Sequence, residues 1–77
     1  NEGGIVISPN PATDAINVSA KANINTIAVY DLNGRVVASF EVNAASIAIN
    51  VSEMTKGLYL VAINTAKGTY TERVIVK

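Results

Sequence analysis

The sequence contains no cysteine and no histidine, and only six carboxylates besides the C-terminus. Without cysteine there are no disulfides and no thiolate ligands for zinc. Without histidine the chain also lacks the residue that most often acts as a general base. Asp14 and Asp31 stand in turn sequences, where aspartate is favoured because it accepts hydrogen bonds from nearby backbone N–H groups. We therefore expect that the protein is not an enzyme, and that it has no catalytic residues, no cofactor-binding residues and no metal ligands.

The chain also has no excess of charge of one sign and no long apolar run. Six basic and six acidic residues give a formal net charge of zero. This argues against electrostatic binding to nucleic acid or anionic lipid. No apolar run approaches the roughly 20 residues that a membrane helix needs, and the opening "NEGGIVIS" does not resemble a signal peptide. The first residue is not methionine, so we expect residues 1–77 to be one domain excised from a longer polypeptide.

What the chain has in quantity is β-forming side chains. It contains nine Ile, ten Val and three Leu, and several stretches alternate apolar and polar residues with a period of two. Turn signals recur about every 8–12 residues, and no segment of helix length shows a helical period. The sequence predicts a small all-β fold, an immunoglobulin-like antiparallel β-sandwich with Greek-key-like order and about seven strands. The expected strands are 4–8, 15–20, 25–31, 35–42, 46–51, 57–65 and 69–76.

Four turn sequences separate these strands. "SPNPATD" (8–14) is predicted to be a rigid extended turn, because Pro9 and Pro11, on either side of Asn10, have no backbone donor. "SEMTKG" (52–57) has room for one helical turn, after which Gly57 starts a strand in a backbone conformation that other residues avoid. "TAKGT" (65–69) closes a hairpin.

"DLNGR" (31–35) is predicted to be the hairpin turn between the third and fourth strands. Asn33 and Gly34 tolerate positive φ, and Asp31 is typical of the first turn position. We expect Leu32 to fold back on the core. The "DLNG" sequence also matches the beginning of a calcium loop, but the later ligands of that motif do not follow.

The three tyrosines raise the alternative of a carbohydrate-binding module, which needs exposed aromatic side chains in a row. Tyr59 alternates with Val61 and Ile63, so we expect it in the core. Tyr30 and Tyr70 are candidates for an outer face, and the sequence leaves carbohydrate binding open.

The last strand has two different faces. Val74 and Val76 share one face, which suits a core, whereas Arg73, Ile75 and Lys77 share the other. At the edge of a sheet such a strand either docks to prevent fraying or offers its backbone to a partner strand. Leu58 and Leu60, opposite in direction to Tyr59, are expected to form a semi-exposed apolar patch.

Three separated motifs carry a resemblance to a known family. "SPNPATDAINVS", "IAVYDLNGRVV" and "GLYLVAINTAKGTYTERVIVK" occur in this order, and from residue 6 to residue 77 the chain resembles the C-terminal sorting domain of the type IX secretion system of Bacteroidetes. Many members of the family have two basic residues in the last strand where this chain has Glu72-Arg73. This difference argues against recognition of a simple basic tail.

The resemblance implies a non-catalytic C-terminal secretion signal. The secretion translocon and its shuttle proteins would recognise it, the attached N-terminal cargo would pass through the periplasm and across the outer membrane to the cell surface, and a surface sortase would then remove the domain. The residues expected to carry recognition are Gly57, Tyr59, Arg73, Val74, Ile75, Val76 and Lys77. The residues expected to be structural motifs are Pro9, Asn10, Pro11, Asp31, Asn33 and Gly34.

Two further alternatives remain open at this point. A structural or adhesive β-sandwich module of a surface protein would have the same composition. A terminal strand that exchanges between two copies would give a strand-swapped homodimer.

Overall fold

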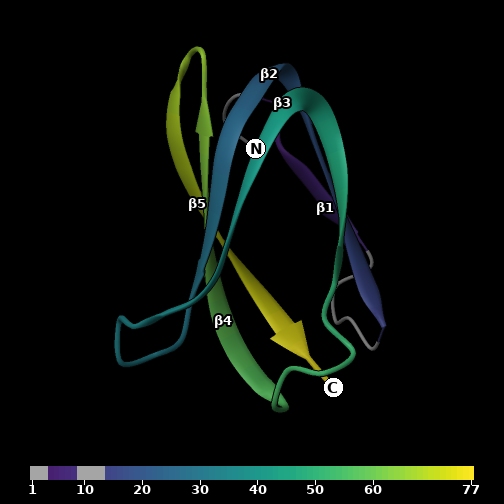
Figure 1. The fold of residues 1–77 in the computed structure, drawn as a ribbon, viewed down its shortest axis with the longest axis vertical. Helices are drawn as coiled ribbons and strands as arrows, with labels where there is room; N and C mark the ends of the chain where they lie inside the picture. Colours follow the sequence, from purple (N-terminus) through teal and green to yellow (C-terminus); the bar gives the residue numbers. More distant parts are fainter. Residues whose placement is uncertain (1–3, 9–13) are drawn as a thin grey trace.

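The computed structural model describes residues 4–8 and 14–77, and it places most of them in five antiparallel strands (Figure 1). These strands are β1 (Val6–Ser8), β2 (Ala15–Tyr30), β3 (Val36–Asn50), β4 (Gly57–Thr65) and β5 (Gly68–Val76). No α-helix occurs among the described residues, and none of their segments forms a helix that could span a membrane. The expected all-β class is confirmed. The expected turn at Pro9, Asn10 and Pro11 lies outside the described residues.

A single curled sheet builds both layers of the fold. Its order is β1-β2-β4-β5, and β3 pairs with β2 off that path. The first half of β2 pairs with β1 and with residues 46–50 of β3, whereas its second half pairs with residues 36–44 of β3 and with β4. β2 and β3 arch together over one end of the molecule (Figure 1), so the two halves of the sheet face each other across the core.

The expected number of seven strands is wrong, because two pairs of expected strands are continuous. The strands expected at 15–20 and 25–31 are continuous in β2 (Ala15–Tyr30), which keeps strand geometry while the register shifts between Ser19 and Ile24. The strands expected at 35–42 and 46–51 are likewise continuous in β3 (Val36–Asn50), which bends near Asn43, a residue with a left-handed φ of 51°. Residues 21–24 and 43–45 contain no proline or glycine, and each bends as part of an irregular strand and does not form a turn.

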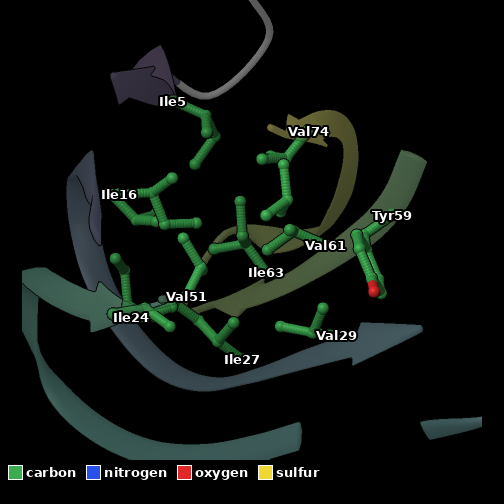
Figure 2. Packing of buried hydrophobic residues seen from close by; sticks show 13 residues of the cluster. Ile5, Ile16, Ile24, Ile27, Val29, Val51, Tyr59, Val61, Ile63 and Val74 are labelled. Atoms are coloured by element: carbon green, nitrogen blue, oxygen red, sulfur yellow. The ribbon is translucent and has the colours of Figure 1, made fainter. Parts of the chain in front are cut away.

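The core fills the space between the two halves of the sheet. Figure 2 shows Ile5, Ile16, Ile63 and Val74 converging from different parts of the chain. The buried hydrophobic side chains, each at most 8% exposed, are Ile5, Ile16, Val18, Ile24, Ile27, Val29, Ile49, Val51, Tyr59, Val61, Ile63, Val74 and Val76. The alternation in the sequence therefore correctly predicted the core face of β4, with Tyr59, Val61 and Ile63, and that of β5, with Val74 and Val76.

The two turns between β3 and β5 differ in how well they were predicted. The hairpin at 65–68 is confirmed, and Gly68 has a φ of +139°. Between β3 and β4 the chain makes a tight turn, in which the N–H of Met54 donates to the carbonyl of Val51 at 3.0 Å. The expected helical turn at 52–57 is wrong, because residues 52–54 form only this turn.

Candidate functional site

The end of the chain is held in the sheet by β4. Gly57 lies opposite Val76, Leu58 opposite Ile75 and Tyr59 opposite Val74. Because alternate residues of a strand point to opposite faces, this register buries Val74 and Val76 and turns Ile75 outward. β5 stands at the end of the strand order. Arg73 and Ile75 on its outer face are exposed, whereas Val74 and Val76 on its inner face complete the core.

A shallow groove of about 450 Å³ lies on this part of the surface. Leu58, Glu72, Arg73 and Ile75 line it. Ile75 is 45% exposed although it is large and apolar, and Leu58 is half-buried beside it. The lining of the groove thus combines two apolar side chains, Leu58 and Ile75, with one carboxylate and one guanidinium.

Apolar side chains continue from the groove across the outer face of the sheet. Leu60 pairs with Tyr30 on β2, and Tyr30 pairs in turn with Val36 on β3. Val36 is 56% exposed, whereas Leu60 and Tyr30 are half-buried. We call this set, Tyr30, Val36, Leu58, Leu60 and Ile75, the outer apolar patch. A patch of this kind on a small domain marks an interaction surface more often than an apolar side chain standing alone does.

The backbone of Gly57 allows the chain to enter β4. Its φ is +150°, a conformation that side chains disfavour, and no atom lies within 4 Å of the position a Cβ would take. The glycine is therefore required by backbone geometry and not by crowding. Its expected role at the start of the strand is confirmed.

Tyr59 takes a structural position. It is 8% exposed, and its hydroxyl donates a hydrogen bond to the carbonyl of Thr55 at 2.5 Å. The ring therefore completes the core while the hydroxyl fastens the turn that leads into β4. The expectation that Tyr59 belongs to the core is confirmed.

The turn between β2 and β3 is organised by one carboxylate. The Oδ1 of Asp31 accepts hydrogen bonds from the N–H groups of Asn33 at 2.9 Å and Arg35 at 3.0 Å. The Nε of Arg35 also lies 3.3 Å from Oδ2. The hydrogen bond from the N–H of Arg35 is the largest cause of a lowered pKa of Asp31. Desolvation, the second largest, opposes it, and the N–H of Asn33 and the Arg35 guanidinium lower the pKa further. These partners account for Asp31 as a turn residue.

Gly34 takes the left-handed conformation in this turn, with a φ of +85°, and its N–H donates to the carbonyl of Asp31 at 3.0 Å. The hairpin expected at "DLNGR" is therefore confirmed. Leu32 does not fold back on the core: it is 68% exposed, because it occupies the tip of the turn, away from the sheet. That expectation is wrong.

The described residues offer little else to a ligand. They contain no group of three or more His, Cys, Asp or Glu side chains that could hold a metal ion. The tyrosines form no row on one face, since Tyr59 is buried and Tyr70 packs against the core, whereas Tyr30 lies on the outer face.

The structure brings only some of the expected recognition residues together on the surface. Arg73 and Ile75 line the groove, and Lys77 follows them, exposed, at the end of the chain. Val74 and Val76 face the core beneath them. Sequence analysis missed Tyr30, Val36 and Glu72 as neighbours of this surface, because their placement depends on which strands pair.

Comparison with known proteins identifies relatives of the whole domain. A family model described as "secretion system C-terminal sorting domain" matches residues 6–77. A solved structure of PorZ, described as an essential bacterial surface component of the type-IX secretion system of Porphyromonas gingivalis, superposes with a TM-score of 0.78 at 21% identity. The match covers 96% of this chain but 11% of that protein, so the chain spans about a tenth of its length. No curated protein matches the chain.

Proposed function

The chain belongs to the family of secretion system C-terminal sorting domains, and from this premise we propose that the type IX secretion machinery reads it as a folded, non-catalytic signal. The observation that carries the proposal is the alternation of buried and exposed side chains within β5. Val74 and Val76 are 1% and 3% exposed, whereas Ile75 between them is 45% exposed. One strand thus stabilises the domain and presents side chains at the same time.

The proposed contact surface is the groove beside β5 together with the outer apolar patch. Ile75 and Leu58 supply apolar area, and Arg73 and Lys77 supply positive charge next to Glu72. Apolar anchors surrounded by a few charged groups are typical of protein–protein contacts. Gly57, Tyr59, Val74 and Val76 act indirectly, by fixing the backbone on which these side chains stand.

The transport route is part of the proposal. An N-terminal cargo carries its own signal across the inner membrane, and this domain then directs the cargo from the periplasm through the outer membrane to the cell surface. A surface sortase removes the domain before or near residue 1. PorZ, described as a component of the type-IX system, contains a region of the same fold, which supports the type IX system as the partner.

The proposal is tested with a fluorescent reporter that carries an inner-membrane export signal and this domain at its C-terminus. In a host with the type IX system we expect the reporter on the cell surface, with the mass of the domain missing. The same reporter without the domain serves as the control and should stay in the periplasm. Equal surface delivery of both reporters would refute the sorting role. Delivery with the domain still attached would refute only the cleavage step.

Deletion of residues 74–77 is a poor test of the same proposal. It removes Val74 and Val76, two buried side chains of the core, so it perturbs folding as well as recognition. Substitutions on the outer face of β5 separate the two effects.

A further inference from the structure

β3 has a backbone edge that no other described strand covers. Among residues 4–8 and 14–77, β3 pairs with β2 alone, along almost all of its length. Backbone groups of an antiparallel strand alternate in direction, so every second residue of β3 turns its N–H and C=O away from β2. β3 is therefore a long edge of the sheet.

Natural proteins usually protect such an edge with lysine, proline or a covering segment. The 15 residues of β3 contain no lysine and no proline, and Glu41 is their only charge. An irregular register near Val37 and the left-handed φ of Asn43 interrupt the strand on either side of residues 38–42. This regular stretch is the part of the edge most suited to accept another strand.

We propose that residues 38–42 pair with the same residues of a second copy of this chain, antiparallel about a twofold axis at Phe40. This edge-to-edge dimer differs from strand exchange, because no segment leaves its own sheet. It is also independent of the recognition surface on β5. A chain with a formal net charge of zero does not repel its own copy at long range. Exposed Ser39 and Glu41 of one copy would also meet Glu41 and Ser39 of the other, so a second copy is complementary to this edge.

The side chains of the segment decide the register. Phe40 lies opposite buried Ile27 and packs against the core, whereas Ser39 and Glu41 are exposed on the other face. A twofold axis at Glu41 would place two carboxylates opposite each other, which is destabilising. An axis at Phe40 instead pairs the two aromatic rings and places each Ser39 hydroxyl opposite a Glu41 carboxylate, which accepts a hydrogen bond from it.

A single pair of short strands makes a small interface, so the dimer is transient, with a dissociation constant of about 10 µM to about 1 mM. Sedimentation equilibrium of the isolated chain should show the mass rise with concentration from 8.0 kDa toward twice that value. Amide exchange measured by NMR should slow at alternate residues within 38–42 over the same concentration range. A mass that stays at the monomer value up to about 1 mM would overturn the proposal.

Two variants at one exposed position test the register. Ser39→Lys places two new ion pairs across the axis and should tighten the dimer about fivefold, whereas Ser39→Glu places like charges there and should weaken it about fivefold. Thr71→Lys and Thr71→Glu make the same charge changes on exposed β5 and should leave the dissociation constant unchanged. A dimer that responds at Thr71, or that shifts in the same direction with both Ser39 variants, uses another surface and contradicts the proposal.

Discussion

Leu58 and Ile75 are cross-strand partners in the β4–β5 hairpin, and both turn their side chains away from the core. Their neighbours Tyr59 and Val74 are also partners, and both are buried. The final strand therefore has a stabilising face and a presenting face in strict alternation. Substitutions on each face are expected to have separate effects on folding and on recognition.

Replacing Ile75 with aspartate should cost about 0.5–1.5 kcal/mol in the free energy of unfolding, because the side chain is only 45% exposed and aspartate is disfavoured within a strand. Replacing fully buried Ile63 with alanine should cost about 2–5 kcal/mol, since it leaves a cavity between the two halves of the sheet. Urea unfolding at neutral pH measures both values. A cost of Ile75→Asp similar to that of Ile63→Ala would show that the outer face is part of the core.

Replacing Tyr59 with phenylalanine keeps the buried ring and removes the hydroxyl that bonds to the carbonyl of Thr55. We expect a loss of about 0.5–1.5 kcal/mol in the free energy of unfolding, and no loss of reporter delivery at a temperature where the domain is folded. Thermal unfolding monitored by circular dichroism gives the first quantity. Failed delivery by a fully folded Tyr59→Phe domain would mean that the hydroxyl contacts the machinery.

Replacing Gly57 with alanine should cost about 1–3 kcal/mol, because the φ of +150° disfavours an L side chain. The space around the position is empty, so the cost comes from the backbone and not from a clash. Chemical synthesis provides a matched control: D-alanine at position 57 has mirror-image preferences and should retain most of the stability. Equal losses with both alanines would contradict a backbone origin.

The stability of the domain should depend on pH through Asp31. Its pKa is lowered from 3.8, chiefly by the hydrogen bond from the N–H of Arg35, so folding favours the charged carboxylate. The contribution of Asp31 is thus present above its ordinary pKa and disappears as the pH falls through the lower pKa of the folded state. We expect the stability difference between the wild type and Asp31→Ala to be constant above pH 3.8 and to shrink below it. A difference that stays constant down to about pH 2 would exclude the charge of Asp31 as its source.

Local patterns were enough to predict the hairpins of the fold. The period-two alternation of Tyr59, Val61 and Ile63 predicted which face of β4 is buried, and the expected boundaries 57–65 match those observed. These features depend on neighbouring residues in the sequence, so the chain itself encodes them. The turn chemistry of Asp31 and Gly34 belongs to the same class.

Features that depend on distant pairing were not predictable in this way. Bending of β2 and β3 looked like four strands. In β2, for example, the apolar alternation changes phase between Val18 and Ile27, so residues 21–24 look like a break unless the partner strand is known. Leu32 was expected in the core from its apolar character alone, but the turn geometry carries it into solvent. The outer apolar patch joins Tyr30 to Leu60 only through the pairing of β2 with β4.

The central claim is that the groove lined by Leu58, Arg73 and Ile75 is recognised while the domain remains folded, and delivery of a reporter carrying Ile75→Asp tests it most directly. Thr71→Asp introduces the same carboxylate at an exposed position of the same strand outside the groove and is the matched control, and unfolding curves must first show that both domains are folded. We predict that Thr71→Asp reaches the cell surface normally, whereas surface delivery of Ile75→Asp falls about tenfold or more and the reporter accumulates in the periplasm. Normal surface delivery of a folded Ile75→Asp domain would contradict the claim.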